Sequence, residues 1–118
     1  MLVSIIAVFF AGMGLYALVA PEALVRPFRI TLESGEARTE VRAVYGGFGL
    51  AMAGLLGWAA SGPPERDGVL VAVAVAVFGM AAGRLAGRVR DRPTSFYPIW
   101  FYFWVEVLAG TALLLAAG

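Results

Sequence analysis

This sequence contains no cysteine, no histidine and no lysine among its 118 residues, and only 14% of them are charged. Without cysteine and histidine, the chain has no disulfide, no thiol catalysis and none of the histidine chemistry that serves acid–base catalysis or metal binding. Nine arginines offset eight acidic residues, and this net charge of +1 argues against nucleic-acid binding. We therefore expect no cofactor, no metal site and no nucleic-acid partner.

The signature motifs of common enzyme classes are also missing. H-E-x-x-H, G-x-S-x-G and the P-loop pattern do not occur in the sequence. An enzyme built from this chain would have to rely on Glu and Arg side chains for proton transfer. The sequence therefore favours a function without catalysis, and we assign no catalytic residue.

Long hydrophobic runs take the place of the missing polar residues. Hydrophobic residues make up 61% of the chain, against roughly 45–50% in an ordinary globular domain. Four runs reach the roughly 17–25 residues of a spanning helix, and they are continuous rather than alternating, which favours helices over barrel strands. The sequence predicts one all-α membrane domain, a compact bundle of four transmembrane helices at about residues 2–20, 36–60, 69–90 and 95–117. Residues 21–35 form either an interfacial segment or a partly ordered loop.

The arginines are distributed unevenly between the connections. Four lie in or beside the first connection and four at the third, whereas the second has one. Basic residues in short loops stay on the cytoplasmic side of the membrane. We therefore expect the first and third connections in the cytoplasm and both termini on the non-cytoplasmic side of the inner membrane. The three groups are Arg26, Arg29, Arg38 and Arg42; Arg84, Arg88, Arg90 and Arg92; and Arg66.

One acid, Glu106, stands in the middle of the fourth apolar run, in the stretch IWFYFWVEVLAG. At 1.5 Å per residue, it lies about 15 Å from either end of the run, near the bilayer centre. A charge at that depth is costly unless it is paired or neutralised. We expect Glu106 to face the bundle interior, either ionised beside Arg84 or neutral, with Tyr102, Tyr16 and Tyr45 as other possible hydrogen-bond donors.

Four further charged residues near the helix ends are candidates for a buried polar network or a ligand site. Arg84 lies one turn inside the third span, where a charge facing lipid is costly, so we expect it to turn inward. Asp91 lies on the same face of the helix as Arg84. The alternative to an inward-facing Arg84 is a cytoplasmic cluster at the membrane surface, in which Asp91 pairs with Arg88. Glu40 and Arg42 are two residues apart and point to opposite sides of a helix, so neither satisfies the other. For Arg42, snorkelling to lipid phosphate and an internal ion pair are equally open.

Small residues recur along the second and third spans. In the second span they occupy two faces, and in the third they recur every four residues, which lets neighbouring helices approach closely. We expect these positions to pack helices together within the chain. Some of them are also candidates for an interface between copies of the chain in an oligomer. The glycines assigned to helix packing are Gly46, Gly47, Gly79, Gly83 and Gly87. In the fourth span, Ala109 and Gly110 leave room for a close neighbour on the face of Glu106.

Two segments, EVRAVYGGFGLAMAGLLG at 40–57 and VFGMAAGRLAGRVRDRPTS at 77–95, resemble the signature segments of a known family. These are small four-helix membrane proteins catalogued as a domain of unknown function, number 4345. The family pattern resembles E-x-R-A-x-Y-G-G in the second helix, G-R ending the third, D-G-x-P in the turn and an acid in the fourth helix. The matching positions are Glu40, Arg42, Ala43, Tyr45, Gly46, Gly47, Gly83, Arg84, Asp91, Pro93 and Glu106, with Arg92 in place of the usual glycine. The resemblance implies the fold and a shared polar set, but no activity.

The sequence favours a structural or binding role in the membrane. Such a bundle would hold a lipid, a small apolar ligand or a partner subunit, either a second copy or another membrane protein. The alternative is a small proton-coupled transporter that uses Glu106. Small multidrug exporters are similar in length, but their intramembrane acid lies in the first helix, where this chain has none. A water-accessible path to Glu106 would favour transport, and a closed, packed Glu106 would favour structure or binding.

Overall fold

The computed structural model of this chain describes residues 1–92 and 96–118, and four helical segments in it are long and apolar enough to cross a membrane. The first is α1 (Leu2–Val19). The second consists of α3 (Gly35–Val41), a wide π-helical turn at Arg42–Gly47 and α4 (Phe48–Ala60). The third is α5 (Arg66–Arg90), and the fourth is α6 (Phe101–Ala116), preceded by a turn at Phe96–Trp100. The all-α membrane fold that the sequence predicts is confirmed.

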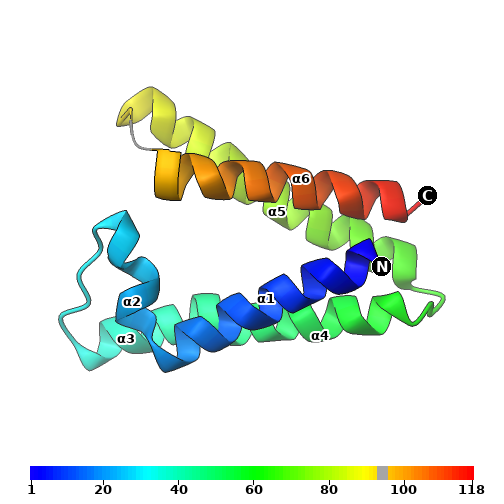
Figure 1. Cartoon of the computed structure of the whole chain (residues 1–118), viewed down its shortest axis with the longest axis horizontal. Coiled ribbons are helices and arrows are strands. Elements are labelled where there is room, and N and C mark those ends of the chain that lie inside the picture. Colours follow the sequence, from blue (N-terminus) through cyan, green and yellow to red (C-terminus); the bar gives the residue numbers. More distant parts are fainter. Residues whose placement is uncertain (93–95) are drawn as a thin grey trace.

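The helices form two pairs (Figure 1). One pair consists of α1 and α4, and the other of α5 and α6. The two termini lie at the same end of the molecule, together with the short connection between α4 and α5. The first and third connections lie at the opposite end. This arrangement is compatible with a chain that crosses a membrane four times, and both that topology and the side of the membrane that each end faces stay predictions.

Local sequence signals account for most helix ends. Pro21 follows directly on α1, and the hydroxyl of Ser34 accepts a hydrogen bond of 3.0 Å from the backbone N–H of Ala37, which caps α3. The helix α5 begins at Arg66, three residues earlier than the sequence suggests, because the Arg66 N–H bonds the carbonyl of Pro63 and continues the turn into the helix. The predicted start of the fourth helix at residue 95, like Pro93, lies outside the described residues.

The main hydrophobic core joins the two pairs at the end where the termini lie. Its most deeply buried side chains, Leu56 of α4, Leu70 of α5 and Leu113 of α6, are fully inaccessible. Six further buried residues complete the cluster: Val3, Ile6, Ala7, Ala59, Val73 and Ala74. All four long helices therefore meet at this end.

The first connection packs inward in its first half. A short helix, α2 (Pro21–Val25), is followed by a 3-10 turn at Arg26–Phe28. Leu24 and Val25 are buried with Ala17 of α1 and Val41 of α3 in a second cluster. The apolar residues of its first half thus contact the bundle itself, while residues 29–34 form no helix, so the interfacial segment and the partly ordered loop both stay predictions.

Glycines bring α1 and α4 into close contact. A Cβ atom added to Gly14 would lie 2.9 Å from the backbone oxygen of Gly46 and 2.9 Å from the backbone nitrogen of Leu50. A Cβ on Gly49 would lie 3.2 Å from the Cα of Gly14. Gly46, which the sequence assigns to helix packing, lies at this contact, and its counterpart on α1 is Gly14, which the sequence reasoning did not single out.

The other four glycines assigned to packing do not contact a neighbouring helix among the described residues. A Cβ added to Gly79, Gly83 or Gly87 would meet no atom within 4 Å, and one on Gly47 would approach only the carbonyl of Arg42 at 3.9 Å. For these four positions helix packing therefore stays a prediction, since the contact of α5 with α6 lies on another face of α5. That face carries Phe78, which packs against α6.

Candidate functional site

Arg84 of α5 and Glu106 of α6 form an ion pair between neighbouring helices. The guanidinium donates from Nε to Oε1 and from Nη2 to Oε2 of the carboxylate, both at 2.9 Å. Glu106 is only 6% exposed, and the side chain of Arg84 keeps 19% of its accessible surface. Such a two-pronged pair is stronger and more directional than a single charged hydrogen bond. The inward orientation of both residues and their pairing, expected from the sequence, are therefore present.

The pair forms where α5 and α6 approach each other closely. A Cβ added to Gly110 would lie 2.7 Å from the Cζ of Phe78, so only glycine leaves room for that ring. Gly110 lies one turn from Glu106 on the same face of α6. The room that the sequence predicts beside Glu106 is thus filled by Phe78, and the contact holds the carboxylate within reach of Arg84.

Two aromatic rings pack against the guanidinium. The Cζ of Arg84 lies 5.5 Å from the ring centroid of Tyr102 and 5.9 Å from that of Phe28, and the two rings stack at 5.7 Å. Cation–π contacts of this kind stabilise a guanidinium that is partly removed from water. Tyr102 was expected on this face. Phe28, which comes from the first connection, was missed, because no spacing in the sequence links it to Arg84.

A groove lies on the other side of Arg84. It has a volume of about 520 Å³ and is lined, besides Arg84, by Tyr45, Met80, Gly83, Gly87, Asp91 and Ile99. The structure therefore brings together three of the predicted polar residues, Tyr45, Arg84 and Asp91, around one open space. Glu106 does not line this groove, although it bonds to the guanidinium that does.

The remaining predicted polar residues have other surroundings. Arg42 donates from Nε to the carbonyl of Leu18 at 3.0 Å, so it caps the last turn of α1 instead of binding an acid. Within the described residues, the side chain of Glu40 is exposed without a partner, and Asp91 forms no ion pair with Arg88. Among the described residues, neither the internal ion pair considered for Arg42 nor the surface pair of Asp91 with Arg88 is formed. Glu40 lies apart from the groove.

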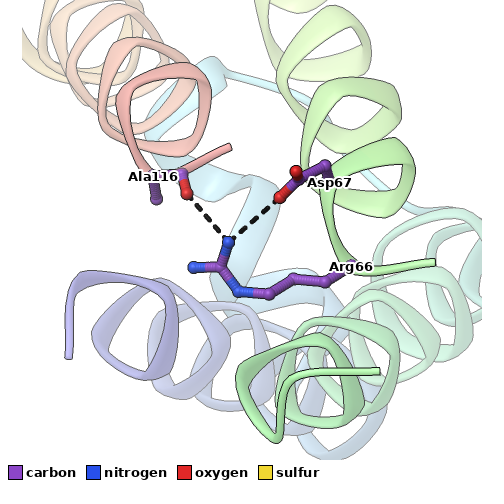
Figure 2. A network of polar contacts seen from close by, with 3 residues as sticks. All are labelled: Arg66, Asp67 and Ala116. Atoms are coloured by element: carbon purple, nitrogen blue, oxygen red, sulfur yellow. Dashed lines mark hydrogen bonds and ion pairs between the residues drawn. The ribbon is translucent and has the colours of Figure 1, made fainter. Parts of the chain in front are cut away.

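A third arginine, Arg66, joins the other ends of α5 and α6 (Figure 2). Its Nη1 donates to the carbonyl of Ala116 at 2.8 Å and to the carboxylate of Asp67 at 3.2 Å. A cation at the last carbonyls of a helix is favourable, because these groups lack partners within the helix and carry the negative end of the helix dipole. Sequence reasoning missed this contact, since a backbone carbonyl as acceptor leaves no trace in the residue pattern.

Comparison with known proteins agrees with this architecture. The sequence profile of the family described as a domain of unknown function (DUF4345) matches residues 1–117. No curated protein and no solved structure matches the chain. The match extends over all four spans and includes both residues of the central ion pair. The chain therefore belongs to the DUF4345 family.

Proposed function

We propose that this chain is a multi-pass inner-membrane bundle that binds an amphipathic lipid or a small apolar ligand in the groove beside α5. The supporting observation is the groove itself, about 520 Å³ in volume, with Met80, Ile99 and two glycines in its apolar lining and Arg84 and Asp91 as charged lining residues. Ligand sites in proteins have this size and this combination of apolar walls with few polar groups.

The ion pair fits a supporting role in such a site. Glu106 holds the guanidinium at two atoms, Nε and Nη2, and therefore fixes the position of a cation whose residue lines the groove. A side chain that is anchored in this way presents its remaining N–H groups at a fixed place, which reduces the entropy lost when a ligand binds.

The same geometry favours binding over proton-coupled transport. A transporter of that kind needs an acid that water reaches and that exchanges its proton during the cycle. Glu106 is 6% exposed, does not line the groove and accepts two charged hydrogen bonds that protonation would weaken. The carboxylate is thus closed off by the residue with which it pairs.

A substitution that fills the groove tests this proposal. Gly83 lines the groove and has open space around its Cα, so Gly83→Leu adds a side chain there without displacing a neighbouring helix. Gly79 lies one turn earlier on α5, has the same open space and does not line the groove, so Gly79→Leu is the matched control. The measurement is the amount of lipid that each variant retains after purification in detergent, determined by mass spectrometry.

We expect the wild-type protein and Gly79→Leu to retain lipid or another apolar molecule at a fixed ratio, and Gly83→Leu to lose it. Equal retention by all three proteins would mean that the bound molecules coat the outer surface and do not occupy the groove. That result, or the lack of any bound molecule in the wild-type protein, would refute the proposed function.

A further inference from the structure

Two groups in the groove have unused hydrogen-bonding capacity. Arg84 has five N–H donors, of which the pairing with Glu106 uses two, and the other three have no partner among the described residues. Asp91 also lines the groove and is exposed, and its carboxylate makes no hydrogen bond or ion pair within the described part of the chain. A complementary ligand would thus offer an acceptor to Arg84 and a charged donor to Asp91.

The charged and apolar residues that line the groove follow a fixed order along α5. Asp91 follows the last residue of the helix, and Arg84 lies seven residues further in, about 10 Å along the helix axis. Met80 lines the groove one turn deeper again. From the end of α5 towards the middle of the span, the groove therefore presents an anion, a cation and then an apolar wall.

We propose that the occupant of the groove is a phospholipid whose head group carries a primary amine, as in phosphatidylethanolamine. Its ammonium donates to Asp91, its phosphate accepts from the free N–H groups of Arg84, and its acyl chains lie towards Met80. A phospholipid inserted from this end carries these three parts in the same order, with the amine outermost and the phosphate nearer the chains. This inference rests on the proposed function, because it identifies the ligand of the same groove.

Other membrane ligands match the groove less completely. A phosphatidylglycerol head group would satisfy Arg84, but its neutral hydroxyls would offer Asp91 a hydrogen bond without the positive charge of an ammonium. A lipophilic amine without phosphate would satisfy Asp91 and leave the N–H groups of Arg84 without an acceptor. Phosphatidylcholine has the right charges, but its quaternary ammonium has no N–H to donate to a carboxylate.

The experiment compares the binding of four amphiphiles to the delipidated protein in detergent by native mass spectrometry. They are phosphatidylethanolamine, phosphatidylcholine and phosphatidylglycerol with identical acyl chains, and a long-chain primary amine. We expect phosphatidylethanolamine to bind about tenfold more tightly than the others, which is the effect of one additional charged hydrogen bond. Asp91→Asn should abolish this preference but retain phospholipid binding. Glu40→Gln, which neutralises an exposed acid outside the groove, should leave the preference unchanged.

The outcomes separate the two proposals. If the phospholipids bind with equal affinity, or if Asp91→Asn keeps the preference, the head-group assignment is wrong while the groove remains a lipid site. If the long-chain amine binds as tightly as phosphatidylethanolamine, the phosphate is not recognised and the assignment is also wrong. If none of the four binds, or if Gly83→Leu binds them like the wild-type protein, the proposed function itself fails.

Discussion

Removing the carboxylate of Glu106 while leaving Arg84 in place should strongly destabilise the protein. Glu106→Gln keeps the size of the side chain, but the amide cannot balance the charge of the guanidinium. Loss of one partner of a buried ion pair costs about 3–5 kcal/mol, chiefly because the remaining charge is left uncompensated. The side chain of Arg84 keeps 19% of its surface accessible, so we expect the lower end of that range, about 3 kcal/mol.

The assay is reversible unfolding in mixed micelles of a mild detergent and sodium dodecyl sulfate, followed by tryptophan fluorescence and far-ultraviolet circular dichroism. The matched control is Glu40→Gln, which makes the same chemical change at an exposed acid that has no partner among the described residues. We expect the control to unfold within about 0.5 kcal/mol of the wild-type protein, as surface substitutions usually do.

A second substitution identifies the cause of the loss. In the double variant Glu106→Gln with Arg84→Met both charges are gone, so no unpaired cation remains between α5 and α6. Replacing a buried ion pair by neutral groups is often close to neutral in stability, and the double variant should be more stable than Glu106→Gln alone. If Glu106→Gln is as stable as the wild-type protein, the pair is not an ionised contact. If the double variant is the least stable of the three, the loss comes from packing and not from the unpaired charge.

Two further predictions concern packing and orientation. Gly14→Ala should destabilise the protein by about 1–3 kcal/mol in the same assay, because its Cβ would meet the backbone of α4 at 2.9 Å. Gly12→Ala, whose Cβ would have no atom within 4 Å, should not destabilise it. Equal stability of the two variants would contradict the close contact between α1 and α4. A reporter fused after Gly118 should behave as a periplasmic protein, and a reporter inserted after Arg92 should behave as a cytoplasmic protein. The reason is that eight of the nine arginines lie in or beside the first and third connections. The reverse pattern would overturn the predicted orientation.

The sequence predicts the pairing of Glu106 well, because the membrane leaves few alternatives for a charge in the middle of a span. An acid at that depth must face inward, and only Arg84 lies far enough inside a neighbouring span to reach it. The same reasoning does not extend to Arg42 and Arg66. Their acceptors are the carbonyls of Leu18 and Ala116, and every residue has a carbonyl, so no residue type marks the partner.

Glycine positions are predicted only in part, for a related reason. A small residue allows close packing but does not require it, because glycine is also tolerated where a helix faces lipid or an open groove. A Cβ added to Gly46 would meet the side chain of Leu18 on α1 at 2.7 Å, whereas one added to Gly79 or Gly83 on α5 would meet nothing within 4 Å. Whether a glycine packs against another helix depends on which face of its helix the partner helix covers, and that depends on the arrangement of the whole bundle.

The positions of the polar contacts indicate how the bundle is held together. Arg42 bonds α1 next to its contact with α4, and both Arg66 and Arg84 bond α6 from α5, so each of these arginines joins the two helices of one pair. Each pair also has a close glycine contact, at Gly14 in one and at Gly110 in the other. Between the pairs, the contact at the end near the termini is an apolar core. At the other end, Phe28 reaches from the first connection to stack on Tyr102 beside the guanidinium of Arg84.

The central ion pair is thus placed where the second pair of helices meets the first connection of the chain. Glu106 fixes the guanidinium from α6, the rings of Phe28 and Tyr102 pack against it, and Arg84 also lines the groove. An arginine that only had to neutralise Glu106 could be enclosed completely, which would strengthen the pair by excluding water. Its partial exposure at the wall of a groove is the observation on which the proposed ligand site rests.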